Sequence, residues 1–586
     1  MEVTTASRTE RPAGLDASTM AEAFQLTARA HPERVALRLK DDELSLTWGE
    51  YADKVRSLTA GLAGLGLARG DTLGIMLTNR PEFHFFDAAA LHLGATPFSL
   101  YNTYTADQIA YQVQDAGARI VVTEKAFLDR FEGVEHLVVV DAGDLDEALT
   151  IADVEAEGDP EFDFEAAWRA VEPDDLLTLI YTSGTTGPPK GVQLTHANEI
   201  SAVQGFDEVI AFPDDGRVIS WLPMAHIAER ACSHYLPIML GFTTTCCPNP
   251  REVVAYLPEV HPTWFFAVPR IWEKLKAAME AAIAAEQDEA KRQATEWALG
   301  VGLKKVRTEQ AGEEVPAELA QEYEKADELV LSKIRARLGL DEVESVNVGA
   351  APTPYEVVEF FHGIGIPLAE LWGMSETCGY GACNPPERIK IGTVGPVAPR
   401  AEIKLAEDGE VLMRGPMVMP GYRNQPDKTR EALDEDGWLH TGDVGEFDED
   451  GYLKIVDRKK ELIINAAGKN MSPANIEAKV KASSPLIGQA IAIGDGRPYN
   501  VALITLDPDV APYFIEQNGR DAVEAEIQRG VDAANEQLAR VEGIKKFKVL
   551  DDEWLPGGDE LTPTMKLKRK PIFEKYAAAI DELYAV

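Results

Sequence analysis

Residues 176–195 read LLTLIYTSGTTGPPKGVQLT, a pattern typical of two strands joined by a glycine-rich loop. The apolar runs at 176–182 and 191–195 have the composition of buried strands. The loop between them contains two glycines, which let the backbone turn tightly and bring N–H groups against an anion. Hydroxyl groups from Ser and Thr and the ammonium group of Lys190 add further donors. The stretch therefore predicts a loop that holds the β- and γ-phosphates of a nucleotide.

The spacing within the loop excludes a Walker A motif. That motif has four residues between its first Gly and a Gly-Lys pair. Here Gly184 is followed by Gly187 and then by Pro-Pro-Lys. A surface turn rich in Gly and Thr is the structural alternative. We favour the phosphate loop because Ser, Thr, Lys and Gly occur together between two predicted strands.

Helical and strand patterns alternate on both sides of the loop. A helix is predicted from Trp48, with Thr47 as its N-cap and Glu50 completing a capping box. Alternation of this kind indicates a largely parallel sheet with helices on its faces, so the predicted fold class is α/β. The further predicted strands are 70–77, 118–124, 216–223, 263–269 and 344–350.

Changes of pattern along the chain predict its domains. Residues 272–338 hold long Ala/Glu/Lys-rich stretches, typical of a helical insertion between two strands. From about residue 402, short strands alternate with turns such as DEDG and indicate a small β subdomain. We expect a large N-terminal domain, 1–456, of mixed, mostly parallel sheets layered with helices, and a small mobile α+β domain, 457–586.

The charge and the cysteines limit the classes of partner. The chain has 57 Lys and Arg against 98 Asp and Glu, a formal net charge of −41. Such a surface repels nucleic acid and anionic lipid at long range, so neither is an expected partner. Any site for a small anion must then concentrate cations and backbone N–H groups. Five cysteines without regular spacing argue against a disulfide framework.

The N-terminal residues and the apolar runs predict a cytoplasmic protein. The first 16 residues are polar and lack the apolar core of a secretory signal. No stretch approaches the ~20 apolar residues of a membrane span. Peripheral contact with the inner face of the membrane and a homodimer both remain open.

The segment 181–191 resembles the phosphate loop of the adenylate-forming superfamily, which includes acyl-CoA synthetases, adenylation domains and luciferases. The resemblance extends over nearly the whole chain and implies ATP and CoA as co-substrates and Mg²⁺ as cofactor. It assigns Thr186 a catalytic as well as a binding role. The residues of this segment that it implies in ATP or AMP binding are Thr182, Ser183, Gly184, Thr185, Thr186, Gly187 and Lys190.

Two later motifs complete the nucleotide site that the resemblance implies. In GAAP (349–352), Gly349 and Ala350 would face adenine. The segment LWGMSET (371–377) is similar to a motif in which Trp372, Gly373 and Ser375 contact AMP. Trp372 offers a flat ring for stacking, and Glu376 is a hard oxygen ligand suited to Mg²⁺. A buried Trp and a solvated Glu are the structural alternatives.

The ribose and the domain hinge are implied by GWLHTGD (437–443) and DRKKE (457–461). The carboxylate of Asp443 can accept from both ribose hydroxyls, and Arg458 would reach the same group. Lys460 falls at the pivot of the hinge in this resemblance. The alternatives are a self-stabilising turn for Asp443 and a basic surface run for the hinge.

Three motifs are similar to the acyl, CoA and catalytic elements of the family. His226 in LPMAHIAER (222–230) would line the acyl pocket, although an ordinary buried histidine is an equal alternative. Gly468, Lys469 and Asn470 fall in the loop that resembles the lining of the CoA channel. Lys566 matches the catalytic lysine, with Met565 where most members have Gly. That departure leaves Lys568 as a second candidate, although the spacing to Arg569 favours Lys566.

The resemblance implies a long-chain fatty acid–CoA ligase that works through an acyl-adenylate. The helical insertion predicted at 272–338 is similar to that of long-chain members. The alternatives are an enzyme that loads a carrier protein in trans, a ligase for medium-chain or aryl acids, and a luciferase-type oxygenase. A non-catalytic nucleotide-binding or lipid-scaffold protein would lack at least one of Lys190, Glu376, Asp443, Arg458 and Lys566, and none is lost.

Overall fold

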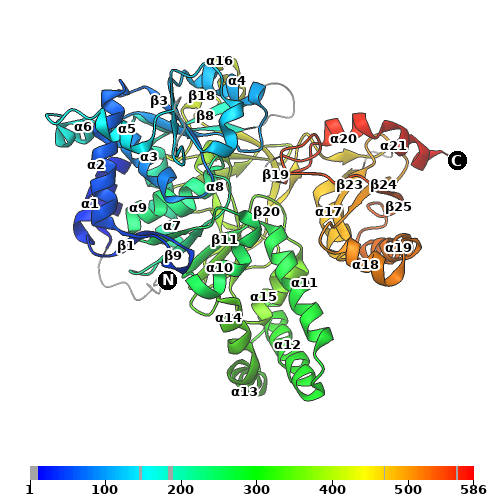
Figure 1. Cartoon of the computed structure of the whole chain (residues 1–586). Helices are drawn as coiled ribbons and strands as arrows, with labels where there is room; N and C mark the ends of the chain where they lie inside the picture. Colours follow the sequence, from blue (N-terminus) through cyan, green and yellow to red (C-terminus); the bar gives the residue numbers. More distant parts are fainter. Residues whose placement is uncertain are drawn as a thin grey trace.

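A computed structural model describes residues 11–143, 148–182, 189–210, 212–466, 469–562 and 565–585, without the side chain of Asn470. Figure 1 shows a large body of layered sheets and helices, from which α11–α14 project, and a smaller C-terminal body in orange and red. The predicted α/β fold class is confirmed.

A seven-stranded sheet forms the centre of the large body, in the order β18-β8-β7-β4-β3-β5-β6. The strands from β7 to β6 run parallel to one another, whereas β8 and β18 are antiparallel to their neighbours. The interior strands β3, β4 and β5 are buried at every position, because helices cover both faces of a parallel sheet. The bounds are β3 Thr72–Met76, β4 Thr96–Ser99, β5 Ile120–Thr123, β6 His136–Val139, β7 Leu176–Thr182, β8 Lys190–Thr195 and β18 Gly421–Tyr422.

Two four-stranded sheets lie beside the first, in the orders β2-β1-β10-β9 and β11-β12-β13-β14. In the second of these, β11, β12 and β13 are parallel, so their carboxyl ends lie at one edge. The bounds are β1 Val35–Leu39, β2 Ser45–Thr47, β9 Arg217–Ser220, β10 Thr243–Cys246, β11 Trp264–Ala267, β12 Ser345–Val348, β13 Leu368–Trp372 and β14 Ala382–Cys383.

A five-stranded sheet, β15-β20-β19-β17-β16, forms the β subdomain predicted from about residue 402. All its neighbouring strands are antiparallel. The register places Asp443 directly opposite Arg458. The bounds are β15 Gly395–Pro396, β16 Glu402–Leu405, β17 Glu410–Arg414, β19 Leu439–Phe447 and β20 Tyr452–Arg458.

The C-terminal body has its own sheet, β23-β24-β25, and a two-stranded ribbon, β21-β22. Helices α17 and α19 cover one face of the sheet with an apolar core that includes Ile476, Ile504 and Ile527. The bounds are β21 Ile463–Ile464, β22 Asn470–Met471, β23 Ile487–Ile493, β24 Asn500–Leu506, β25 Ile544–Leu550, α17 Pro473–Ala482, α18 Ala511–Asn518, α19 Asp521–Gln537, α20 Arg569–Lys575 and α21 Ala577–Tyr584.

The helices of the large body follow the predicted alternation. The helix predicted from Trp48 is confirmed, with the Thr47–Glu50 capping box in place. The bounds are α1 Met20–Ala30, α2 Trp48–Gly64, α3 Pro81–His92, α4 Ala106–Ala116, α5 Ile151–Ala156, α6 Phe164–Arg169, α7 His196–Ile210, α8 Ile227–Arg230, α9 Leu236–Leu240, α10 Val253–Val260, α11 Pro269–Ala285, α12 Glu289–Gln310, α13 Ala317–Ala326, α14 Ser332–Leu338, α15 Tyr355–Gly363 and α16 Pro426–Ala432.

The helical insertion is divided more finely than the sequence pattern suggests. The structure breaks it between α11 and α12, where Asp288 accepts from Ala290 N and Lys291 N and caps the second helix. Within the described ranges, none of the helices is long and apolar enough to cross a membrane. All five cysteines are free thiols.

Candidate active site

Three of the predicted nucleotide residues lie at the carboxyl ends of strands. Thr182 ends β7, the turn at Gly349 follows β12, and Trp372 ends β13. Loops at these ends are where open α/β sheets bind ligands. Thr182 and Lys190 pair in register at the base of the predicted phosphate loop. The loop residues between them, Ser183, Gly184, Thr185, Thr186 and Gly187, lie outside the described residues.

Asp443, Trp372 and Arg458 form one hydrogen-bonded cluster. The Trp372 indole N–H donates to Asp443 Oδ2 at 2.8 Å, and Arg458 Nε lies 2.7 Å from Asp443 Oδ1. Burial raises the pKa of the Asp443 carboxyl, while Arg458 and Trp372 act in the opposite direction. The cluster holds the predicted ribose carboxylate beside the predicted adenine-stacking ring.

Glu376, the predicted Mg²⁺ ligand, is held by a residue that the sequence did not suggest. The Tyr422 hydroxyl donates to Glu376 Oε1 at 2.8 Å. Lys190 Nζ lies over the same tyrosine ring, 4.0 Å from its centroid. Tyr422 occupies a two-residue strand without a motif of its own, so no local pattern marks it.

The predicted cations gather around these two carboxylates. Burial lowers the pKa of Lys190, and the nearby charges of Lys428, Lys460 and Arg458 lower it further, while Glu376 raises it. A chain with a net charge of −41 thus concentrates positive charge at one place. A polyanion such as ATP needs this arrangement.

Lys566 reaches this group of charges from the C-terminal body. Although part of the residue is exposed, the surrounding protein desolvates its ammonium group and lowers its pKa. Arg458 lowers that pKa further, whereas Asp443 and Glu376 raise it. The structure therefore brings Lys566 together with the nucleotide residues of the large body. Lys568 points elsewhere, because its Nζ donates to Gly558 O at 2.8 Å.

The backbone conformation at Met565 suits glycine better than methionine. Met565 has φ +65°, in the left-handed region that glycine adopts without strain. Thr562 clamps this turn, because Met565 N donates to Thr562 O and Lys566 N donates to Thr562 Oγ1. Met565 thus has a backbone conformation that glycine would adopt more readily.

Two further turns of the predicted nucleotide site restrict which residues fit without strain. Ala350 has φ +70°, so the turn after β12 is held in a conformation that costs energy for a residue with a Cβ. A Cβ on Gly373 would lie 2.2 Å from the Gly379 backbone, so only glycine fits there. Ser375 follows at the start of a 3₁₀ turn that includes Glu376.

His226 is the N-cap of helix α8 and lies near Lys566. Its Nδ1 accepts from Ala228 N at 3.2 Å. Burial lowers the pKa of His226 to about 3, and Lys566 contributes to the same shift, so the imidazole is neutral at physiological pH. Helix α8 adjoins a small cavity, with room for about one water molecule, whose walls are both polar and apolar. Its lining residues are Val218, Ile219, Trp221, Glu229, Cys232, Trp264, Phe265 and Phe266.

A buried polar network supports this part of the fold. Arg230 and Asp87 have no exposed side-chain surface, and Arg230 Nη1 lies 2.6 Å from Asp87 Oδ2. The Nε2–H of His234 donates to the other Asp87 oxygen, Oδ1, at 3.0 Å. Arg230 and His234 therefore both pair with a carboxylate of helix α3. The sequence alone could not identify Asp87 as their partner, because it lies in α3, far away along the chain.

The predicted hinge lies where the chain passes between the two bodies. The ammonium group of Lys459 contacts Asp408 and Glu410 of the large body. Glu461 contacts Arg569 of the C-terminal body. Lys460 is exposed between them. In the predicted CoA-channel loop, Asn470 belongs to β22, Lys469 is exposed, and Gly468 lies outside the described residues.

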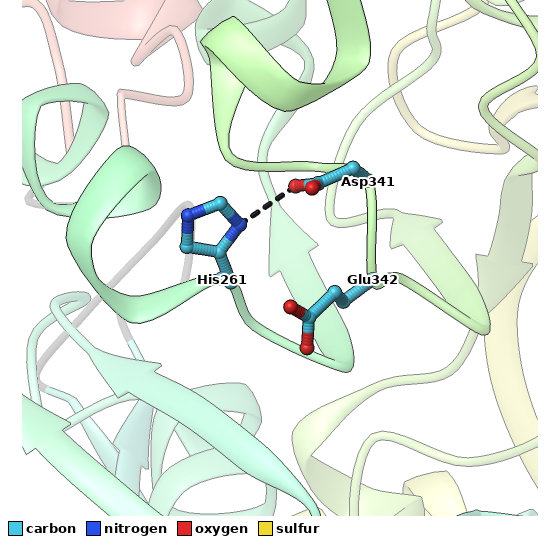
Figure 2. Close-up of side chains that lie close together, drawn as sticks. All are labelled: His261, Asp341 and Glu342. Atoms are coloured by element: carbon cyan, nitrogen blue, oxygen red, sulfur yellow. Dashed lines mark hydrogen bonds and ion pairs between the residues drawn. The ribbon is translucent and has the colours of Figure 1, made fainter. Parts of the chain in front are cut away.

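One group of possible metal ligands lies near the amino-terminal ends of β11 and β12, away from the predicted nucleotide residues. His261 Nδ1 lies 2.7 Å from Asp341 Oδ1, with Glu342 nearby (Figure 2). These residues precede β11 and β12, at the ends opposite the Gly349 turn.

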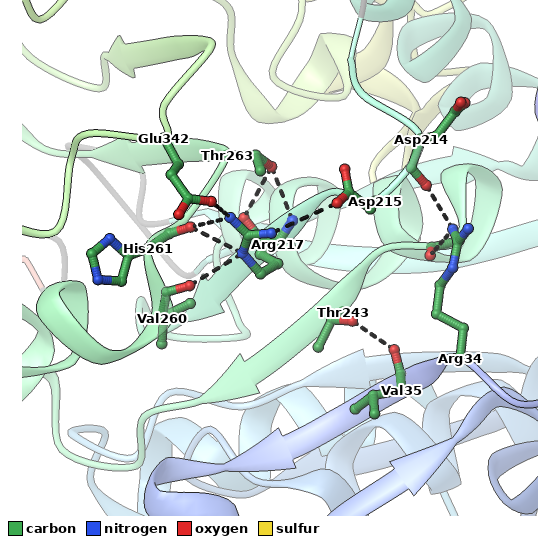
Figure 3. A network of polar contacts seen from close by, with 11 residues as sticks. Arg34, Val35, Asp214, Asp215, Arg217, Thr243, Val260, His261, Thr263 and Glu342 are labelled. Atoms are coloured by element: carbon green, nitrogen blue, oxygen red, sulfur yellow. Dashed lines mark hydrogen bonds and ion pairs between the residues drawn. The ribbon is translucent and has the colours of Figure 1, made fainter. Parts of the chain in front are cut away.

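Arg217 occupies the centre of the polar network around this group (Figure 3). Its guanidinium group contacts Glu342 and donates to the backbone oxygens of Val260 and His261. Because the Arg217 guanidinium already neutralises Glu342, we interpret His261, Asp341 and Glu342 as part of a structural link between sheets.

Comparisons with known proteins cover both bodies. The AMP-binding enzyme family matches residues 24–423, and the AMP-binding enzyme C-terminal domain matches residues 460–586. “Putative fatty-acid–CoA ligase fadD11” of Mycobacterium tuberculosis is 54% identical over 72% of this chain and 76% of its own. “Long-chain-fatty-acid–CoA ligase ACSBG2” of Xenopus laevis is 33% identical over 98% of this chain and 84% of its own.

Solved structures share the fold. The adenylation domain of a carboxylate reductase from Mycobacterium chelonae has a TM-score of 0.75 at 19% identity, covering 98% of this chain and 92% of its own. The O-succinylbenzoate–CoA synthetase of Bacillus subtilis in complex with AMP has a TM-score of 0.69 at 24% identity, covering 94% and 97%. The two family matches show that this chain belongs to the family of AMP-binding enzymes.

Proposed function

We propose that the protein is a long-chain fatty acid–CoA ligase that forms an acyl-adenylate from ATP and then the acyl-CoA. The observation that carries this proposal is the convergence of Lys566, Asp443, Arg458 and Glu376 from both bodies. The names of the relatives support the fatty acid substrate, since those named long-chain-fatty-acid–CoA ligases align over 92–98% of this chain.

In the first half-reaction, a carboxylate oxygen of the fatty acid attacks the α-phosphorus of ATP. A new P–O bond forms, the bond to the β-phosphate oxygen breaks, and diphosphate leaves. Lys566 would neutralise the charge that develops on the phosphate oxygens, and Asp443 with Arg458 would fix the ribose. Removing one such electrostatic contact commonly costs about 10²–10³ in rate.

Mg²⁺ fits the residues present at Glu376. The Glu376 side chain is 6% exposed, and its Oε1 accepts from Tyr422. For Oε2, the part of the chain that the structure describes offers no hydrogen-bond donor. Mg²⁺ commonly takes one or two carboxylates together with water and substrate phosphates. When bound, it would neutralise charge on the phosphates, and Glu376 would hold it.

In the second half-reaction, the CoA sulfur attacks the acyl carbon. The C–S bond forms, the C–O bond to AMP breaks, AMP leaves with the electron pair, and the thiol proton is lost to solvent. For this step, Lys566 has to move away from the acyl group. Rotation about Lys460 would remove it and bring the 464–473 loop, with Gly468, Lys469 and Asn470, to the site.

Diphosphate release on mixing the protein with ATP, Mg²⁺ and palmitate tests the proposal. We expect release that depends on palmitate, and palmitoyl-CoA when CoA is added. A panel of acids from short-chain to long-chain, with benzoate as the aryl member, should give the highest kcat/KM for long chains. Adenylate that accumulates without reacting with CoA would favour a carrier-loading enzyme. No diphosphate release with any acid would overturn the proposal.

A further inference from the structure

Tyr422 lies between two groups that the proposed reaction needs. Its ring faces Lys190, whose Nζ is 4.0 Å from the ring centroid. Its hydroxyl donates to Glu376 Oε1 at 2.8 Å. One side chain therefore contacts both the cation of the phosphate loop and the predicted metal ligand.

Without the tyrosine, Lys190 and Glu376 have an obvious alternative. They carry opposite charges and lie close enough for Glu376 to raise the pKa of Lys190. A direct ion pair would occupy both groups before a nucleotide arrived. In the described part of the chain, Lys190 makes no ion pair with Glu376; instead it lies over the aromatic ring, a position that stabilises a cation.

The backbone around Tyr422 is held rigidly. Tyr422 pairs with Val192 of β8, two residues after Lys190. Its N–H donates to Thr429 Oγ1 at 2.9 Å, and the next residue donates to Gly191 O at 2.8 Å. A Cβ on Gly421 would lie 2.7 Å from Thr429, so glycine permits this close approach. A side chain fixed in this way can orient its partners.

We propose that Tyr422 is a positioning residue that keeps Lys190 and Glu376 apart, with Lys190 oriented for the phosphates of ATP and Glu376 oriented for Mg²⁺. This inference rests on the proposed function, because it assumes that MgATP binds here. It predicts that the ring and the hydroxyl have separable effects. The ring would serve nucleotide binding through Lys190, and the hydroxyl would serve metal binding through Glu376.

Calorimetric titration of the full chain with ATP, without an acyl substrate, separates the two effects. Tyr422→Phe keeps the ring and removes the hydroxyl. We expect metal-free ATP to bind Tyr422→Phe within about twofold of the unaltered chain. The gain in affinity that Mg²⁺ provides should fall about tenfold, since a hydrogen bond to a charged group is lost. Tyr422→Leu removes the ring as well and should also weaken the binding of metal-free ATP.

A double-mutant cycle with Glu376→Gln provides the matched control. If the hydroxyl acts through Glu376, Tyr422→Phe should have no further effect on the Mg²⁺ dependence in the Glu376→Gln background. A general loss of structure would instead lower metal-free and Mg²⁺-dependent affinity by the same factor, which would overturn the role. An unchanged Mg²⁺ gain in Tyr422→Phe would overturn it too. Absence of ATP binding by the unaltered chain would contradict the proposed function itself.

Discussion

At the scale of single residues, the turn before Lys566 offers a sharp test of how the lysine is presented. Met565 has φ +65°, a conformation that a β-branched residue accepts poorly and that glycine accepts freely. We predict that Met565→Gly keeps the adenylation rate within about threefold, since strain of about 1–3 kcal/mol is removed rather than added. Met565→Val should lower that rate by about tenfold or more.

Stopped-flow measurement of diphosphate release and of thioester formation from supplied acyl-AMP would check this prediction. Thioester formation should be unaffected in both variants, because Lys566 takes no part in that step. Equal activity of the Gly and Val variants in adenylation would show that the backbone conformation of this turn does not matter.

The sequence could identify the charged residues of the site but not their mutual contacts. Lys190, Glu376, Asp443, Arg458 and Lys566 stand in motifs with distinctive spacing, and the structure brings them together. The hydrogen bond from Trp372 to Asp443 depends on a contact between residues 71 positions apart. Tyr422 could not be predicted at all, because its role arises only when β18 pairs with β8.

At the scale of elements, the segment after β20 is the predicted pivot. Lys459 is anchored to one body and Glu461 to the other, which leaves Lys460 as the residue whose torsions can change. We predict that Lys460→Pro, which fixes φ, slows thioester formation by about tenfold or more and adenylation much less. The two half-reactions would be measured separately.

Lys460→Ala is the matched control, since it removes the same side chain without fixing the backbone. It should leave the ratio of the two half-reaction rates close to that of the unaltered chain. If the proline variant slowed adenylation more than thioester formation, the hinge would have to lie elsewhere.

Elements with strong local signals were predictable, and short ones were not. The capping box of α2 is a local pattern, so its start was predicted correctly. The pattern of residues 272–338 indicated helices, but the break capped by Asp288 has only a weak local signal. Two-residue strands such as β14, β15 and β18 are defined by their partners, so no sequence period reveals them.

At the scale of the whole molecule, ion pairs between the two bodies accompany the approach of Lys566. Arg270 and Lys274, one helical turn apart on α11, contact Asp507 and Asp509. Lys479 of α17 contacts Glu356 of α15 at 2.7 Å. These contacts belong to the arrangement in which Lys566 lies at the nucleotide site, so rotation of the C-terminal body would break them.

Lys274→Glu should therefore disfavour this arrangement. Because exposed ion pairs contribute about 0.2–1 kcal/mol, we expect adenylation to slow by about two- to fivefold at low ionic strength, and less at high salt. Combining it with Asp509→Lys should restore the rate. Lys305→Glu is the control, since Lys305 pairs with Glu309 within α12. A slower rate that the charge exchange fails to restore would contradict the role of the pair.

The distribution of charge over the molecule was partly predictable. A net charge of −41 required a local concentration of cations wherever ATP binds, and the site has one. The orientation of the C-terminal body could not be predicted, because it depends on exposed ion pairs and close contacts rather than on any periodic pattern.

The two half-reaction rates of Lys566→Ala test the proposed role of the C-terminal lysine most directly. We predict that adenylate formation from ATP and palmitate falls about 10²–10³-fold or more, because the ammonium group that counters the phosphate charge is lost. Thioester formation from supplied palmitoyl-AMP and CoA should remain within about threefold of the unaltered chain. Equal loss of both rates, or unaltered adenylation, would contradict it.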